Sequence, residues 1–162
     1  MSIPAEITVR EVMTSDPITV TPDTSLRQAI ELLANRRIGG LPVIQDDNTL
    51  AGVLSEAELM WQESGVNRPP YITLLDSVIF LENPATYEKE LHKALGQQVK
   101  DVMNQKVVTV APDVALREAA RLMHRKEVPR LVVVDEAAAS PVVGIITRGD
   151  VIRYMASHQD EG

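Results

Sequence analysis

Hydrophobic and polar positions near the start of this 162-residue chain follow strand and helix spacings in turn. Residues 18–20 form a short β-rich run that stops at a Thr-Pro-Asp turn. Ser25, with Gln28 three residues later, forms a capping box before apolar positions at helical spacing. Two apolar strands at residues 41–44 and 51–54 follow, and Ser55 caps a helix that runs through Met60. The pattern predicts the order β-α-β-β-α.

The same pattern occurs a second time. Repeat 1 begins with VREVM at Val9 and repeat 2 begins with VKDVM at Val99, and the two align at a constant offset as far as the second strand. After two extra residues in repeat 2, the match resumes between the GVLS segment at Gly52 and the GIIT segment at Gly144. In repeat 2 we expect strands at residues 107–110, 131–135 and 142–146 and helices at 115–126 and 148–157. An internal duplication is therefore predicted.

A sheet of three strands with two helices on one side leaves its other face uncovered, so two such units are expected to pair. We therefore predict an α/β (α+β) fold of two β-α-β-β-α units related by pseudo-twofold symmetry. The expected organisation is one domain at residues 1–61, a helical linker insertion at 62–98, a second domain at 99–157 and a flexible tail at 158–162. The insertion has two interpretations. One is a linker with a single helix between Asn83 and Gly96, and the other is a lid or partner-docking element made from this helix and residues 71–81.

Composition narrows the classes of function. A net charge of −7 disfavours binding to a nucleic-acid backbone, and the absence of cysteine excludes disulfides and thiol chemistry. No apolar stretch is long enough to span a membrane, and residues 1–10 have no signal-peptide core, so we expect a cytoplasmic protein. His92, His124 and His158 lack metal-ligand spacing, and no phosphate-binding glycine loop or nucleophile elbow is present. The sequence predicts no enzyme, no metal site and no required cofactor.

The ordered pattern V-x-x-V-M, T-V-x-P-D, L-V-V-V-D and G-I-I-T-R-G-D resembles the CBS domain, named after cystathionine β-synthase. Two in tandem resemble a CBS pair, or Bateman module. The resemblance implies a stand-alone regulatory module that binds AMP, ADP, ATP or a related adenosyl ligand such as S-adenosylmethionine. It also implies a homodimer that passes the ligand state to an unknown effector protein. The alternative is a ligand-independent module for dimerisation and protein interaction.

In this family the last strand and the following helix start carry Gly, an apolar residue, any residue, Ser or Thr, two residues and then Asp. The Asp accepts hydrogen bonds from both ribose hydroxyls, while the hydroxyl and the helix N-terminus face phosphate. Repeat 2 matches fully with Thr147 and Asp150, whereas repeat 1 has Ser55 but Glu58 in place of Asp. We therefore expect the Asp150 cleft to bind a nucleoside phosphate better than the Glu58 cleft.

The resemblance completes each cleft with residues of the other repeat. The expected ligand-binding residues of the stronger cleft are Ile18, Ile38, Gly39, Gly40, Arg130, Ile145, Thr147 and Asp150, and those of the weaker cleft are Val108, Val128, Pro129, Ser55 and Glu58. Ile18 and Ile38 are expected to enclose the adenine, and Arg130 is expected to contact phosphate. Arg148 and Lys126 are second choices for the phosphate contact. Each of these residues also has a purely structural interpretation. Thr147 with Asp150 fits a plain capping box, and Arg130 fits a surface residue without a ligand.

Overall fold

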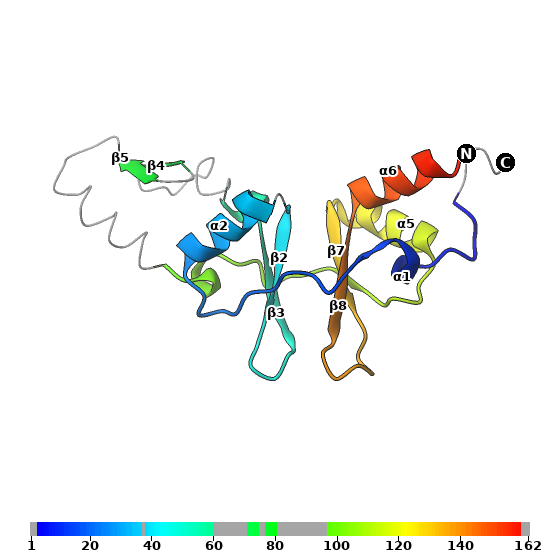
Figure 1. The fold of residues 1–162 in the computed structure, drawn as a ribbon, viewed down its shortest axis with the longest axis horizontal. Coiled ribbons are helices and arrows are strands. Elements are labelled where there is room, and N and C mark those ends of the chain that lie inside the picture. The colour runs from blue at the N-terminus through cyan, green and yellow to red at the C-terminus, as the bar shows by residue number, and fades with distance from the viewer. Residues whose placement is uncertain (1–2, 37, 60–70, 75–76, 81–96, 160–162) are drawn as a thin grey trace. The chain divides into compact units, whose positions relative to one another are not determined.

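A computed structural model of the chain describes residues 3–36, 38–59, 71–74, 77–80 and 97–159 (Figure 1). The named helices in these ranges are α1 (Val9–Val12), α2 (Leu26–Arg36), η1 (Val99–Asp101), α5 (Leu116–Lys126) and α6 (Arg148–Ser157). The strands are β1 (Thr14–Ser15), β2 (Gly40–Ile44), β3 (Leu50–Ser55), β4 (Tyr71–Leu74), β5 (Ser77–Phe80), β6 (Thr109–Val110), β7 (Arg130–Val134) and β8 (Val142–Thr147). Mixed α and β structure is therefore confirmed, with the hairpin strands of both repeats and the helices α2, α5 and α6 in place. Of the helix expected from Ser55 through Met60, residues 56–59 are helical and residue 60 lies outside the described residues.

Two compact units form, and each is assembled from separate stretches of the chain. The second-repeat unit comprises Met1–Ile18, Asp47–Leu50 and Lys106–Gly162, and the first-repeat unit comprises Thr19–Asp46 and Ala51–Gln105. Each unit thus contains most of one repeat together with the segment that opens the other repeat. The domain boundaries expected at 1–61 and 99–157 follow the sequence repeats, and the compact units divide the chain differently.

In the second-repeat unit the strand order is β1-β8-β7-β6. β8 pairs antiparallel with both β1 and β7, and β6 pairs parallel with β7. Helix α5 packs on β7 and α6 packs on β8, while α1 contacts β8 and both helices (Figure 1). The core joins buried aliphatic side chains from all these elements: Val9, Val110, Leu116, Ala119, Met123, Leu131, Val133, Ile146 and Val151. The α5 members of this core recur at helical spacing, which places them on one face of the helix.

In the first-repeat unit, α2 packs on the two-stranded β2–β3 hairpin. The strand expected at residues 18–20 is wrong in extent, because only Val20 pairs, through a single parallel bridge to Val43. Its equivalent in repeat 2 is shortened in the same way to β6. Prolines explain the short strand of repeat 1, since Pro17 and Pro22 flank it and lack the N–H that a ladder needs.

The insertion between the repeats contains an antiparallel hairpin, in which β4 pairs with β5 from Tyr71↔Phe80 to Leu74↔Ser77. This hairpin falls in the segment that one interpretation treated as a lid or docking element. The helix expected between Asn83 and Gly96 lies outside the described residues. The choice between linker and lid therefore stays a prediction.

The segments that open the two repeats form helical turns that the sequence pattern did not predict. In the second-repeat unit the backbone N–H of Arg10 donates to the carbonyl of Pro112 at 2.9 Å. In the first-repeat unit the backbone N–H of Lys100 donates to the carbonyl of Pro22 at 3.0 Å. Arg10 and Lys100 occupy the same position in the two repeats, as do Pro112 and Pro22. Each unit is thus completed by the opening segment of the other repeat.

Candidate functional site at the start of helix α6

The glycine of the family pattern has a packing role. A Cβ atom on Gly144 would lie 3.0 Å from both the Cγ of Met13 and the carbonyl oxygen of Thr14. A Cβ atom on Gly52 would lie 2.8 Å from the carbonyl oxygen of Asn104. At both positions the opening segment of the other repeat passes too close to the strand for any side chain. The glycine is therefore required by the fold, whether or not a ligand binds nearby.

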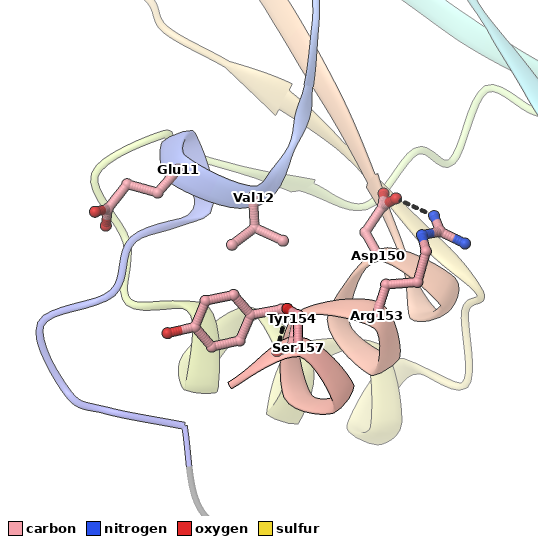
Figure 2. Close-up of a pocket in the computed structure, with 6 residues that line it drawn as sticks. All are labelled: Glu11, Val12, Asp150, Arg153, Tyr154 and Ser157. Carbon is pink, nitrogen blue, oxygen red and sulfur yellow. Dashed lines mark hydrogen bonds and ion pairs between the residues drawn. The ribbon is translucent and has the colours of Figure 1, made fainter. Parts of the chain in front are cut away.

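Thr147 and Asp150 form the capping box that begins α6. The Thr147 backbone N–H donates to Asp150 Oδ2 at 2.8 Å, and the Asp150 N–H donates to Thr147 Oγ1 at 3.1 Å. The other carboxylate oxygen, Oδ1, accepts a hydrogen bond from Arg153 Nη2 at 2.5 Å (Figure 2). The Asp150 side chain is 13% exposed and that of Arg153 is 72% exposed. Asp150 therefore uses Oδ2 for the helix cap, and its Oδ1 contacts the exposed side chain of Arg153.

The equivalent helix start in repeat 1 has a different hydrogen-bond pattern. Glu58 Oε2 accepts from the backbone N–H of Ser55 at 2.7 Å and also from the Ser55 hydroxyl. The Ser55 hydroxyl oxygen accepts in turn from the Ala57 N–H at 3.2 Å. Because the longer Glu58 side chain folds back onto both groups of Ser55, the serine hydroxyl donates to the carboxylate. The two predicted ligand segments are thus alike in sequence but differ in how the acidic side chain is used.

Arg130 is placed next to the α6 start by the β7–β8 pairing. Its Cα is the register partner of Thr147, and the Arg148 N–H donates to the Pro129 carbonyl at 3.0 Å. Residues directly opposite in an antiparallel pair project from the same face of the sheet. Arg130, Thr147 and Asp150 therefore gather at one end of one unit. Gly40, which begins β2, holds the equivalent place in repeat 1.

The predicted ligand-binding residues as a whole are divided between the two units. The second-repeat unit contains Ile18, Val108, Val128, Pro129, Arg130, Ile145, Thr147 and Asp150, and the first-repeat unit contains Ile38, Gly39, Gly40, Ser55 and Glu58. The structure brings together Arg130 with Thr147 and Asp150 in one unit, and Ser55 with Glu58 in the other. Each predicted cleft also draws on the other unit, and that completion stays a prediction.

A surface pocket of about 370 Å³ lies between α1 and α6 in the second-repeat unit (Figure 2). Its lining residues are Glu11, Val12, Asp150, Arg153, Tyr154 and Ser157. The Val12 side chain and the Tyr154 ring form its apolar part, and charged groups stand at its ends (Figure 2). The sequence pattern did not predict this pocket, because the pocket depends on the packing of α1 against repeat 2. The Thr8–Glu11 capping box, in which Glu11 accepts from the Thr8 N–H at 2.7 Å, was the local signal for the α1 turn.

Two further properties concern the described part of the chain. None of its helices combines the length and the hydrophobicity needed to cross a membrane. Its histidine, aspartate and glutamate side chains form no group of three placed to hold a metal ion.

Comparison with known proteins gives matches over nearly the whole chain. The family model described as "CBS domain" matches twice, at residues 9–63 and 99–157. The uncharacterized protein MJ1426 of Methanocaldococcus jannaschii is 31% identical over 162 residues, which cover 96% of this chain and 95% of that protein. The chloroplastic CBS domain-containing protein CBSX2 of Arabidopsis thaliana is 36% identical over 140 residues, 83% of this chain. This chain spans 56% of the length of that relative.

A solved structure matches the fold as well as the sequence. The crystal structure of CBSX2 in complex with AMP has a TM-score of 0.69 and 32% sequence identity to this chain. The match covers 94% of this chain and 98% of that one.

Proposed function

This chain belongs to the CBS domain family and carries the domain twice, and on that premise we propose that it is a regulatory module that senses an adenine nucleotide or a related adenosyl ligand. In this proposal it is a homodimeric cytoplasmic protein without catalytic activity or a required cofactor. It passes the ligand state to a separate effector protein. AMP and ATP are the leading ligands.

The grouping of Arg130, Thr147 and Asp150 at the start of α6 carries the proposal. A helix N-terminus presents N–H groups that have no partner within the helix, and these suit phosphate, as does the guanidinium of Arg130. A carboxylate can accept from both hydroxyls of a ribose. CBSX2, whose structure was solved with AMP, is 32% identical to this chain, and the match covers 94% of this chain. These facts support AMP-like ligands over unrelated classes.

The contact between Asp150 and Arg153 suggests how binding alters the protein. Asp150 Oδ2 is held by the helix cap, so a ribose hydroxyl would use Oδ1, which already accepts from Arg153. A ribose hydroxyl at Oδ1 would therefore share this oxygen with the Arg153 guanidinium or displace the guanidinium from it. Arg153 also lines the pocket between α1 and α6. A ligand shifts a protein between states only by binding them unequally, and this exchange supplies such a difference. The rearranged surface around Arg153 is the proposed signal to the effector.

Isothermal calorimetry with AMP, ADP, ATP and S-adenosylmethionine tests the proposal. We expect at least one ligand to bind, and Asp150→Asn to weaken it about tenfold or more, while Asp46→Asn in the exposed β2–β3 turn leaves it unchanged. Ligand at one hundred times its Kd would stabilise the fold by about 2.7 kcal/mol, which a thermal shift detects. Circular dichroism shows that the variants fold. The proposal is overturned by absence of binding at millimolar ligand, or by binding that Asp150→Asn does not weaken.

A ligand-independent dimerisation and interaction module is the second candidate. The observation that favours it is that both acidic side chains already have partners in the protein, Glu58 through Ser55 and Asp150 through Thr147 and Arg153. Sedimentation equilibrium distinguishes the two. A dimerisation constant that is the same with and without AMP, and in Asp150→Asn, supports this candidate.

A further inference from the structure

Helix α5 carries a row of arginines on the side turned away from its core. The buried residues of this helix, spaced three and four apart, are Leu116, Ala119 and Met123. Arg117, Arg121 and Arg125 recur at intervals of four residues, which places them one above the other on the opposite side of the helix. We call these three arginines the α5 ridge. At 1.5 Å of rise per residue, the ridge is about 12 Å long.

The α5 ridge has few partners within the protein. Arg121 forms an ion pair with Glu118 of the same helix. In the part of the chain that the structure describes, neither Arg117 nor Arg125 forms an ion pair, and the Nε of Arg117 is buried without a hydrogen-bond partner. Like charges four residues apart destabilise a helix, and a cation in the first turn opposes the helix dipole. The ridge therefore opposes the stability of α5 and leaves guanidinium donors available to an external anion.

Helix α2, the equivalent helix of repeat 1, has no such row. The residues at the equivalent positions are Arg27, Glu31 and Asn35. Arg27 Nε lies 3.5 Å from Glu31 Oε1, so these two charges compensate each other. Both helices have the same buried pattern, and α2 has a net charge of +1 where α5 has +3. The fold is thus built in repeat 1 without the ridge, so packing does not explain it.

Acidic residues at both ends limit what the α5 ridge can bind. Asp113, whose side chain is 85% exposed, precedes α5, and the exposed Glu127 follows it. A long polyanion such as a nucleic acid would extend past the ridge, meet these carboxylates and be repelled by a chain of net charge −7. A short segment with its own carboxylates at the spacing of the ridge would contact the arginines alone. Glutamates four residues apart on a helix have this spacing.

We propose that the α5 ridge is a docking surface for a short acidic helix of a partner protein, with a glutamate or aspartate at every fourth residue. Each carboxylate of the partner faces one guanidinium, whose planar donors match a carboxylate in a bidentate pair. Arg117 is the anchor of this surface, because its partly buried guanidinium is less screened by solvent than those of Arg121 and Arg125. The docking does not require an adenosyl ligand, so this inference goes beyond the proposed function.

Two synthetic peptides test the docking. Both are alanine-rich, amidated and about 18 residues long, which is sufficient for a helix to form in isolation. One carries three glutamates at intervals of four residues, and the other carries glutamine at the same positions. Two-dimensional NMR of the isotopically labelled chain at low salt measures the affinity and shows which residues respond. We expect shifts along α5 with the glutamate peptide, binding at least about fivefold weaker with the glutamine peptide, and loss of the difference as salt is added.

Matched variants assign the binding to the ridge. Arg121→Gln/Arg125→Gln removes two exposed charges from α5, and Arg27→Gln/Arg36→Gln removes two exposed charges from α2. The first variant should weaken the glutamate peptide about fivefold to tenfold and the second less than twofold, since each exposed ion pair contributes modestly. Arg117→Gln alone should weaken it more than Arg125→Gln alone. Urea unfolding should show the α5 variants to be no less stable than the unmodified chain.

Several results would overturn the proposal. They are equal binding of the two peptides to the unmodified chain, equal effects of the α5 and α2 variants, and an unfolding midpoint that falls in the α5 variants, which would make the ridge a structural feature. Tighter binding of duplex DNA than of the glutamate peptide would assign the ridge to nucleic acid instead. Self-association that is lost in Arg121→Gln/Arg125→Gln, measured by sedimentation, would assign it to a second copy. The peptide comparison on the unmodified chain decides the question even if a variant fails to fold.

Discussion

The Lys100 ammonium nitrogen lies 3.1 Å from the Asp23 carboxylate, so the opening segment of repeat 2 is tied to repeat 1. The equivalent pair in the other unit is Arg10 with Asp113, at 3.6 Å. Both pairs are half or more exposed, and their partners are far apart in sequence. Beside each pair a fully buried valine, Val9 or Val99, enters the core. The same crossing contact is thus made twice by equivalent residues.

Burial, more than charge, is expected to hold these segments in place. We predict that Val9→Ala lowers the free energy of unfolding by about 1.5–3 kcal/mol, because two buried methyl groups are lost and a cavity remains. Arg10→Ala should lower it by less than about 1 kcal/mol, since its ion pairs are exposed to solvent. Urea denaturation measures both. A larger loss for Arg10→Ala than for Val9→Ala would show that charge holds the segment.

The two strand glycines are expected to resist substitution. Gly144→Ala and Gly52→Ala should each destabilise the fold by about 1–3 kcal/mol, because the added Cβ meets backbone of the opposing segment. Met13→Ala should relieve part of the loss at Gly144 and none at Gly52, which a double-mutant cycle detects.

Gly149 provides the matched control for these substitutions. A Cβ there would meet first the flexible end of Arg153, at 3.2 Å. Gly149→Ala is therefore expected to be neutral or to stabilise α6 by up to about 1 kcal/mol, as alanine does within helices. Equal losses at all three glycines in thermal or urea unfolding would contradict the packing argument.

Thr147 has a stability role that can be separated from ligand binding. Thr147→Ala should cost about 1 kcal/mol because the Asp150 N–H loses its cap, and Thr147→Ser should cost much less because the hydroxyl is kept. Unfolding without ligand measures this role. If Thr147→Ala leaves stability unchanged, the capping box contributes nothing to the fold.

Replacement of one carboxylate tests why the two helix starts differ. In Glu58→Asp the shorter side chain can no longer fold back onto the Ser55 hydroxyl, so the pattern seen at Thr147 and Asp150 becomes available. We expect tighter binding of AMP at this site, by about threefold to tenfold, because the shorter side chain can place its carboxylate as Asp150 does, with one oxygen in the helix cap and the other turned toward the ribose. Ser55→Ala with Glu58 retained serves as the comparison. Weaker binding by Glu58→Asp would contradict this account.

Asp47, in the turn between β2 and β3, has a pKa held below its usual range, mainly by the hydrogen bond from the Thr49 hydroxyl. A lowered pKa in the folded state means that this contact stabilises the fold above the unfolded-state pKa, and that the effect is lost as the pH falls through the folded pKa. Thr49→Val should raise the Asp47 pKa and Thr49→Ser should retain it. Carboxyl carbon NMR titration checks both, and an unchanged pKa in Thr49→Val would reject the hydroxyl as the cause.

The sequence by itself determined the duplication, the order of the main elements and the capping boxes. The helix expected at residues 148–157 is α6, and the one expected at 115–126 differs from α5 by one residue. Ser25 accepts from the Gln28 N–H at 3.2 Å, as its spacing predicted. These features are predictable because amphipathic spacing and capping depend on residues within a turn or two of one another.

Only the tertiary structure decided which repeat each opening segment completes, that Met13 lies against Gly144, and that Asp150 shares its free oxygen with Arg153. It also reduced the strand expected at residues 18–20 to one bridge at Val20. Contacts between distant segments leave no periodic mark in the sequence, because their spacing is set by the path of the chain. The identity of the acidic residue was visible in the sequence, whereas the partner of each of its oxygens depended on side-chain packing in three dimensions.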